Sequence, residues 1–568
     1  MKLTIATALL IISICGAADA PNVTPQIWSP VSTTFEETAE RPWQDVVACC
    51  QIDEEADTCL ENGSKPFKKV VIGRMPQFTS QDALQVLQVA VQAWDRGTGV
   101  WPQMSLAERC RAIEAVFEEL AKVREEIVTT LMWEIGKNRK EAEAEFDRTV
   151  DFAKQVIQTI KSDDEYKGVW QSIGSTRAII RRAAIGIIMC LAPYNYPINE
   201  SYAAMIPALL TGNIILMKIP AVGGLAHLLT MEAFNKVLPP GTVNFVSGSG
   251  RKTMPPLMES GLIDGLAFIG GSKAADQLIH SHPHPHRLKV FLQLEANNMG
   301  IVLPDVFESE KEALLDNALN EIVLGSLSFN GQRCTALKLI FVPHASAESF
   351  ALQLAKKVEA LRVGLPWQNH AEDSAQPLLS NITPLPNEGR IQYMTSLLTD
   401  AVSKGARIMN ENGGKIIGGN DSTLMVPAVL YPVTENMEIF HEEQFGPLVP
   451  IAPYDSLEQV LKFGKEGPYA QQVSIFTENP KETALILDRF SAIFGKINLN
   501  SQCGRSPDTL PFAGRRSSAM GVMSVNDALR EFSVPTVVSY KETEGLNHAE
   551  LAQDMEARSV FLSPVGDQ

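Results

Sequence analysis

Between about residues 175 and 296 the sequence alternates regularly between short apolar runs and amphipathic stretches. Apolar runs bounded by Gly or Pro indicate buried strands, and apolar residues three and four positions apart indicate helices. The predicted strands are residues 175–193, 213–220, 243–248, 265–271 and 288–296, and the predicted helices are 227–238, 251–261 and a segment that begins at Ser272. Strands that alternate with helices form a parallel sheet with crossover helices, so the sequence predicts an α/β fold.

The flanking regions extend this prediction. Residues 80–160 have helical spacing, and a second α/β series runs from about 310 to 511. Residues 534–541 read as an isolated strand, which we expect to pair with a distant segment. At 568 residues the chain is long enough for two large domains.

The charge balance excludes one class of function. The chain has 66 acidic and 49 basic residues, which gives a net charge of -17. Nucleic acids are bound through clustered Lys and Arg, and no basic stripe occurs in this sequence. We therefore expect no nucleic-acid partner.

The N-terminus has the layout of a signal peptide. In residues 1–20 a Lys precedes an apolar run, and the run ends in the small-residue pattern Ala18-Asp19-Ala20. A misassigned start codon is the alternative interpretation. Residues 21–75 are expected to form an irregular extension, in which Cys49, Cys50 and Cys59 can form a local disulfide. No further segment predicts a membrane span, so the mature protein is not expected in a membrane.

Cys334 lies in the stretch SFNGQRCTALK, directly after an Asn-Gly pair. A lone Cys is a small buried apolar residue, half of a disulfide, or a nucleophile. The scattered cysteines of the mature chain do not resemble a disulfide scaffold. The choice between the remaining two readings depends on motifs elsewhere in the chain.

Several short motifs occur in one order along the chain. They are PYNYP at 193–197, GNIILMKIP at 212–220, FIGGS at 268–272, FNGQRC at 329–334, EEQFGP at 442–447 and LPFAG at 510–514. Together they resemble the aldehyde dehydrogenase superfamily, over roughly residues 80–541. The resemblance implies two Rossmann-like α/β domains with parallel sheets and a β-strand oligomerisation arm. It also implies a homo-oligomer, as a dimer or a tetramer.

The implied domains follow the predicted elements. A cofactor-binding domain is expected at 76–308, interrupted by arm strands at about 166–183, and a catalytic domain is expected at 309–525. An oligomerisation strand at 526–545 and a C-terminal tail at 546–568 complete the chain.

The resemblance makes Cys334 the catalytic nucleophile, because a thiolate adds readily to an aldehyde. Arg333 and nearby backbone amides are expected to lower the pKa of its thiol. The oxyanion of the adduct needs preorganised donors. In the superfamily these are the amide of the Cys and the side chain of an Asn, which matches Asn195.

The position of the general base departs from the family pattern. Family members have a Glu in an LELGGK-type strand end, and this chain reads LQLEANNMG at 292–300. Ungapped counting places Gln293 at the base position, and Gln cannot accept a proton. Glu295 lies two residues later, and residues two apart on a strand share a face, so Glu295 can serve as the base if the loop is shortened. Glu295 is therefore the predicted base.

The cofactor residues match in the same way. Lys218 corresponds to a family Lys on the adenosine ribose, Gly270 and Gly271 precede a helix start that suits a pyrophosphate, and Glu443 and Phe445 match residues at the nicotinamide ribose and ring. NAD-preferring members have a Glu where this chain has Ala221. A carboxylate there repels a 2′-phosphate, so its absence predicts NADP as the cofactor. Gly248-Ser249-Gly250 is a partial dinucleotide fingerprint, interpreted as a turn.

Within this superfamily the chain most resembles the NADP-dependent, non-phosphorylating glyceraldehyde-3-phosphate dehydrogenases. In that branch arginines and a tyrosine bind the substrate phosphate, and the matching positions are Arg148, Tyr196, Arg333 and Arg505. Structural ion pairs at Arg148 and Arg505 are the alternative interpretation.

The resemblance implies oxidation of D-glyceraldehyde 3-phosphate to 3-phosphoglycerate with NADP and without inorganic phosphate. Two alternatives stay open, a dehydrogenase for another anionic aldehyde such as a semialdehyde, and a homologue of the same scaffold that has lost turnover. No metal is expected, because the prolines of HSHPHPH at 280–286 prevent a helical ligand pair, and this segment is interpreted as a solvent loop. The N-terminus suggests a secretory route or a plastid with extra membranes, whereas the chemistry suggests the cytoplasm.

Overall fold

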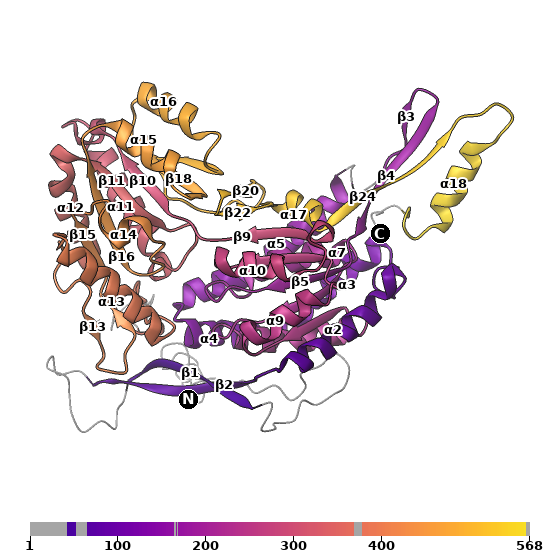
Figure 1. The fold of residues 1–568 in the computed structure, drawn as a ribbon, viewed down its shortest axis with the longest axis horizontal. Helices are drawn as coiled ribbons and strands as arrows, with labels where there is room; N and C mark the ends of the chain where they lie inside the picture. Colours follow the sequence, from indigo (N-terminus) through magenta and orange to yellow (C-terminus); the bar gives the residue numbers. More distant parts are fainter. Residues whose placement is uncertain (1–41, 53–64, 164–165, 167, 369–377, 564–568) are drawn as a thin grey trace, which may run out of the picture.

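The computed structural model describes residues 42–52, 65–163, 166, 168–368 and 378–563. These residues form two α/β lobes and an arm that projects from one of them (Figure 1). The predicted α/β class, with two Rossmann-like lobes, is confirmed. The predictions for residues 1–20 and for a disulfide among Cys49, Cys50 and Cys59 lie outside the residues or side chains that the structure describes.

The first lobe contains a six-stranded sheet in the order β22-β9-β8-β5-β6-β7. Its neighbouring strands are parallel, except that β22 pairs antiparallel with β9. The strands are β5 (Ile187–Leu191), β6 (Ile214–Lys218), β7 (Val243–Val246), β8 (Gly265–Ile269), β9 (Lys289–Gln293) and β22 (Ala519–Met520). Every residue of β6 and β7 is buried, because both faces of a parallel sheet are covered, and this explains the continuous apolar runs in the sequence.

Helices surround this sheet. They are α2 (Ser80–Trp94), α3 (Leu106–Lys122), α4 (Arg124–Ile135), α5 (Arg139–Ser162), α7 (Asn199–Leu210), α8 (Leu225–Val237), α9 (Gly250–Glu259), α10 (Ser272–Ser281) and α17 (Val525–Glu531). Capping boxes at Thr79, Ser105 and Asn138 begin α2, α3 and α5. Each cap side chain accepts the N–H three residues ahead, and the backbone N–H of the cap residue donates to the carboxylate of that residue.

One predicted strand, residues 175–193, is two strands in different sheets. β4 (Thr176–Ala184) belongs to the arm, and β5 belongs to the first lobe. The chain turns between them at Gly186, where φ is 148°. A Cβ at this position would lie 2.0 Å from the Asp264 carboxylate. Apolar residues continue across the turn, so hydrophobicity alone did not reveal the break.

The second lobe contains a seven-stranded sheet in the order β12-β15-β16-β11-β10-β18-β19, parallel except at β12. Its strands are β10 (Asn298–Val302), β11 (Leu337–Pro343), β12 (Arg407–Ile408), β15 (Ala428–Tyr431), β16 (Leu448–Tyr454), β18 (Gln472–Phe476) and β19 (Lys496–Leu499). Its helices are α11 (Glu312–Leu327), α12 (His344–Glu359), α13 (Glu388–Ser403), α14 (Glu438–His441), α15 (Leu457–Glu466) and α16 (Pro480–Phe490). Because β10 belongs to this sheet, the chain enters the second lobe before Asn298, ahead of the predicted boundary at 308.

Short ribbons complete the second lobe and its return to the first. They are β13 (Ile416–Ile417) with β14 (Leu424–Met425), β17 (Tyr469–Ala470) with β21 (Arg515–Arg516), and β20 (Phe512–Ala513) with β23 (Val522–Met523).

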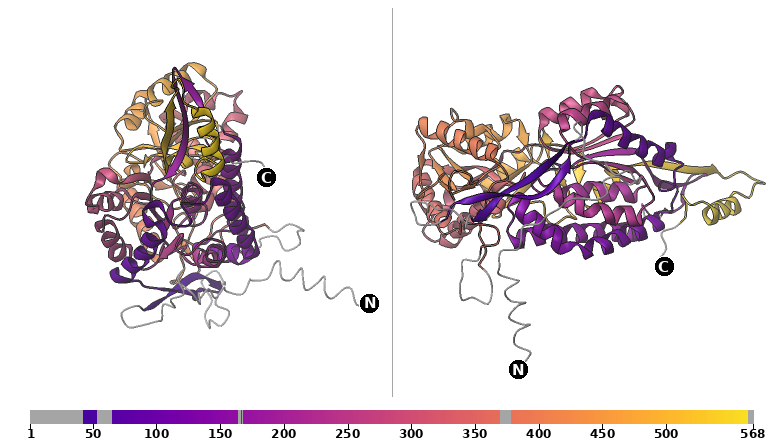
Figure 2. Two further views of the ribbon diagram at one scale, coloured as in Figure 1. Left: turned by 90° about the vertical axis from the view of Figure 1, so that its right-hand side faces the viewer. Right: turned by 90° about the horizontal axis from the view of Figure 1, so that it is seen from below.

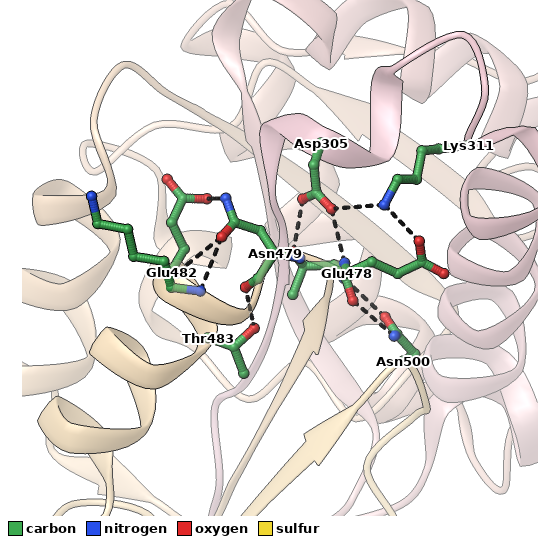
Figure 3. Close-up of polar contacts among 9 residues, drawn as sticks. Asp305, Lys311, Glu478, Asn479, Glu482, Thr483 and Asn500 are labelled. Carbon is green, nitrogen blue, oxygen red and sulfur yellow. Dashed lines mark hydrogen bonds and ion pairs between the residues drawn. The ribbon is translucent and has the colours of Figure 1, made fainter.

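Polar side chains connect the carboxyl ends of three neighbouring strands of the second lobe (Figure 3). Asp305, which follows β10, accepts the Thr477 hydroxyl at 2.7 Å and the Glu478 N–H at 2.8 Å. Asn500, which follows β19, exchanges two hydrogen bonds with the backbone of Thr477, at 2.9 and 2.8 Å. Asn479 caps α16. These bonds fix the positions of β10, β18 and β19 relative to one another at the carboxyl ends of the strands.

Two paired strands lie within the segment that was predicted to be irregular. β1 (Trp43–Ile52) and β2 (Phe67–Pro76) form an antiparallel pair on the underside of the molecule (Figure 2). β2 touches both lobes, since it packs against α8 and the Phe67 N–H donates to the Gly418 carbonyl at 2.7 Å. The irregular prediction is therefore wrong for these strands. Ile72 and Met75 are buried by long-range contacts that a local pattern does not reveal.

The arm is a three-stranded antiparallel sheet in the order β24-β4-β3. β24 (Ser533–Lys541) pairs along its whole length with β4, which confirms the predicted pairing of residues 534–541 with a distant strand. β3 (Gln171–Ile173) forms the other edge, and α18 (His548–Arg558) follows β24, so the predicted tail contains a helix. The side chain of Val537 is 58% exposed on this arm.

The histidine-rich segment is not wholly a solvent loop. His282 is 3% exposed, and its Nε2 lies 3.1 Å from the Ile263 carbonyl oxygen. Its Nδ1 accepts the His284 N–H, which assigns the proton to Nε2. Within the described ranges no group of three or more metal-ligating side chains occurs, and no helix is long and apolar enough to cross a membrane.

Candidate active site

A cavity of about 1140 Å³ collects most of the predicted site residues. Its lining includes Arg148, Asn195, Tyr196, Ala221, Gly270, Gly271, Glu295, Arg333, Cys334, Glu443, Phe445 and Arg505. Lys218 lines a second cavity of about 870 Å³ that shares part of its wall with the first. Residues from both lobes thus meet at one place.

The loop before Cys334 has an unusual backbone. Phe329, Asn330 and Gly331 have φ values of 48°, 56° and 72°, a conformation that is costly for the two non-glycine residues. Tertiary bonds hold it in place: the Phe329 N–H donates to Glu141 at 3.0 Å, and the Asn330 side chain exchanges two bonds with Thr383. The fold therefore fixes the position of the Cys backbone.

Burial raises the pKa of the Cys334 thiol to about 12, and the carboxylates of Glu200 and Glu443 act in the same direction. The cations that lower this pKa are Lys338 and Arg505. The Arg333 guanidinium donates instead to the Gly325 carbonyl at 2.8 Å and to Gln502 at 3.0 Å. The thiolate-stabilising role predicted for Arg333 is therefore assigned to Lys338 and Arg505.

Asn195 lies beside the Cys loop as predicted. It is 6% exposed, and its Nδ2 donates to the Gln332 carbonyl at 2.7 Å. The Tyr194 hydroxyl donates to the Gln332 side chain at 3.1 Å. One hydrogen bond leaves the second Nδ2 proton of Asn195 for a ligand.

The two candidates for the base position lie in different surroundings. Gln293 ends β9 and is 4% exposed, and neither polar atom of its side chain has a partner among the described residues. Because β9 stops there, the strand-face argument does not reach Glu295. The Glu295 carboxylate instead accepts the Ser272 N–H with both oxygens, at 2.9 and 2.8 Å. It thereby caps the N-terminus of α10.

The second cavity is lined by Lys218, the residue that the sequence predicted at the adenosine ribose. Lys218 is 7% exposed, and burial lowers its pKa to about 8. Ala221 lines both cavities. Gly248, Ser249 and Gly250, interpreted from the sequence as a turn, also line this cavity, as do the neighbouring Ser247 and Arg251. They lie at the start of α9, and this position was the signal that sequence reasoning undervalued.

Glu443 and Phe445 line the larger cavity. Lys338, which sequence reasoning missed, interacts with both of them. The Lys338 Nζ lies 4.7 Å from the centroid of the Phe445 ring. Burial raises the pKa of Glu443 and lowers the pKa of Lys338, while each group opposes the shift of the other. Oε1 of Glu443 has no partner among the described residues.

The four predicted phosphate contacts all line the larger cavity, but two have carboxylate partners. Arg148 makes a bidentate pair with Asp508, at 2.9 and 2.7 Å. Arg505 pairs with Glu200 at 2.6 Å and with Asp508 at 3.2 Å. The ion pairs that the sequence offered as the alternative are therefore present. Asp508 lies three residues after Arg505, a spacing that the sequence does reveal.

Comparison with known proteins identifies the family. The pattern of the aldehyde dehydrogenase family matches residues 54–538, which is most of the chain. The chain belongs to the aldehyde dehydrogenase family.

Individual aldehyde dehydrogenases are similar at modest identity. The NADP-dependent glyceraldehyde-3-phosphate dehydrogenase of Streptococcus equinus is 28% identical over 478 residues, covering 83% of this chain and 92% of that protein. The lactaldehyde dehydrogenase of Methanocaldococcus jannaschii is 24% identical over 484 residues, covering 84% and 96%. The crystal structure of NADP-dependent glyceraldehyde-3-phosphate dehydrogenase from Bacillus halodurans C-125, complexed with NADP, has a TM-score of 0.76 at 25% identity and covers 92% of this chain and 100% of that one.

Proposed function

We propose that this aldehyde dehydrogenase oxidises D-glyceraldehyde 3-phosphate to 3-phosphoglycerate with NADP and without inorganic phosphate. One observation carries the proposal: the cavity that holds Cys334 also holds guanidinium groups with free donors. Nε of Arg333 and Nη2 of Arg505 are buried and have no partner among the described residues. Guanidinium N–H groups suit a phosphate. The name of the Streptococcus equinus relative supports the same substrate.

NADP is the cofactor. Lys218 and Arg251 supply two cations to the smaller cavity, and Ala221 presents no carboxylate to repel a 2′-phosphate. Both glyceraldehyde-3-phosphate dehydrogenases described above are named as NADP-dependent. When bound, NADP accepts a hydride from the substrate carbon. Lys218, Ala221 and residues 247–251 would hold its adenosine half, and Glu443 and Phe445 would hold its nicotinamide half.

Cys334 begins the reaction. Its thiol loses a proton to solvent, and the sulfur attacks the aldehyde carbon to form a thiohemiacetal. The Cys334 N–H and the Asn195 side chain hold the oxyanion. Loss of hydride from the same carbon leaves a thioester on Cys334.

Water completes the reaction at the thioester. It attacks the acyl carbon, the carbon–sulfur bond breaks, and the acid leaves as the thiol is restored. A base must accept the proton of this water, and the Gln293 amide cannot do so. Glu295 is the proposed base, so its carboxylate must first leave the Ser272 N–H.

The substrate assignment is tested with Arg505→Gln. In an assay without inorganic phosphate we expect wild type to form NADPH from D-glyceraldehyde 3-phosphate. We expect the variant to lose about 10- to 100-fold in kcat/KM for this substrate, because a charge-assisted bond to the phosphate is lost. The loss for unphosphorylated glyceraldehyde should be at most a few-fold. No NADPH from the phosphorylated aldehyde with wild type would refute the assignment.

Glu200→Gln is the matched control. It removes the counter-charge of Arg505 while keeping the side-chain shape, so KM for the phosphorylated aldehyde should fall, opposite to the effect at Arg505.

A second candidate function follows from the same contacts. Because Arg148 and Arg505 already have carboxylate partners, an aldehyde with less negative charge, such as a carboxylate semialdehyde, is the next substrate to test. An NADPH burst without turnover on every aldehyde would favour a homologue that has lost turnover.

We also propose that the arm joins copies of this chain into a dimer or a tetramer. Val534 and Val537 on β24 are 44% and 58% exposed, and exposed apolar residues on a sheet mark an interaction surface. Light scattering of wild type should give a multiple of the chain mass, and Val537→Asp should lower it. A monomeric wild type would contradict this proposal.

A further inference from the structure

The first turn of α10 lies where the two cavities join. Four residues line both cavities: Pro220, Ala221, Val222 and Asn387. On the other side, Gly270 and Gly271 line the larger cavity, and Ala274 and Gln277 line the smaller one. A dinucleotide that fills both cavities must therefore pass the N-terminus of α10 with its pyrophosphate. Helix N-termini bind anions through free N–H groups and the helix dipole.

An acidic side chain of the chain itself lies at this place. Both carboxylate oxygens of Glu295 accept the Ser272 N–H, at 2.9 and 2.8 Å. Gly271 leaves room for this approach, because a Cβ there would lie 3.0 Å from Oε1 of Glu295. Glu295 thus makes the contact that a phosphate oxygen would make.

The surroundings of Glu295 oppose a second anion. Burial raises the pKa of Tyr469, which lines the same cavity, and the acidic groups of Glu295, Glu442 and Glu443 act in the same direction. A pyrophosphate that enters beside these carboxylates is repelled unless Glu295 moves away. The freed carboxylate can accept a hydrogen bond in the cavity, since the buried amide of Gln293 has no partner among the described residues.

We propose that Glu295 competes with the cofactor pyrophosphate for the N-terminus of α10, and that cofactor binding releases its carboxylate into the cavity of Cys334. Cofactor binding must then break the contact between Glu295 and the Ser272 N–H, and this lowers the affinity for the cofactor. The same event frees the base that the thioester needs. The second half of this inference depends on the proposed function, and the first half does not.

The test is the dissociation constant of NADP, measured by calorimetry on the full chain without substrate. Glu295→Gln keeps the shape but loses the charge and one acceptor oxygen, so we expect NADP to bind about tenfold more tightly. Adenosine 2′-monophosphate lacks the pyrophosphate, and its affinity should not change. Hydrogen exchange at the start of α10 should be faster in the unliganded variant, because the Ser272 N–H loses its charged acceptor.

Glu108→Gln is the matched control, because Glu108 also caps a helix N-terminus but lies outside both cavities. It should leave NADP affinity unchanged. Weaker or unchanged NADP binding in Glu295→Gln would overturn the competition. An equal gain for adenosine 2′-monophosphate would also overturn it, since the effect would then be a general charge effect.

Turnover separates this inference from the proposed function. With an aldehyde that wild type oxidises, Glu295→Gln should keep the first burst of NADPH and lose steady turnover, although NADP binds more tightly. Full turnover in the variant would refute release of Glu295 as the base. If no aldehyde is oxidised by wild type, the proposed function fails, while the binding experiment still decides the competition.

Discussion

Cys334→Ala is expected to lower NADPH formation from an aldehyde by at least about 10³-fold. In the proposed function Cys334 supplies the sulfur of the covalent adduct, so the variant should show neither a burst nor steady turnover. NADP affinity, measured by calorimetry, should stay near the wild-type value. This pair of results would assign Cys334 to the chemical step, because a folding defect would lower both quantities.

Cys110→Ala is the matched control. Burial raises the pKa of both thiols to about 12, but Cys110 lies in α3 outside the cavity, and its removal should leave activity nearly unchanged. The raised pKa of Cys334 also predicts how the alkylation rate of this thiol depends on pH. Because the thiol is protonated at neutral pH, its alkylation by iodoacetamide should speed up about tenfold per pH unit over roughly pH 7 to 10. A rate that is constant over this range would show that the thiolate already dominates, contrary to the structure.

The sequence predicted much of the first lobe. The strands at 213–220, 243–248 and 265–271 appear as β6, β7 and β8, because buried parallel strands are continuous apolar runs with helices between them. The paired strands β1 and β2 were missed. Their segment is polar and acidic overall, and only contacts with both lobes make the strands stable.

The sequence predicted which residues line the site, but it did not predict the contacts that these residues make. The motifs placed Cys334, Asn195 and the arginines in one cavity, which they do line. They did not show that Asp508 and Glu200 neutralise two of the arginines, because ion pairs between distant segments depend on the folded geometry. The position at which β9 ends, Gln293, likewise depends on the folded geometry. Because the strand ends there, Glu295 faces α10.

Glu145→Gln is expected to destabilise the protein by about 3–5 kcal/mol, because it leaves the Lys137 ammonium buried without its counter-charge. Both side chains of this ion pair are fully buried. Glu145 also accepts the N–H groups of Ile198 and Asn199 at 3.0 and 3.2 Å. The free energy of unfolding in urea measures the effect. Glu143→Gln, at the exposed pair with Arg139 on the same helix, should change it by at most about 1 kcal/mol.

The pH dependence of this deficit identifies its cause. Burial lowers the pKa of Lys137 in the folded protein, and loss of the Glu145 charge must lower it further. The unfolded chain then binds more protons than the folded one between the lowered pKa and the ordinary value of 10.5, so the stability of the variant rises with pH across that window. The deficit should therefore shrink as the pH is raised from neutrality. A deficit that is independent of pH would mean that weakened hydrogen bonds to the N–H groups of Ile198 and Asn199, rather than the unpaired ammonium, destabilise the variant. Lys137 also lies 3.4 Å from the centroid of the Tyr196 ring, so an ammonium that loses its proton weakens one contact that positions this wall of the active site.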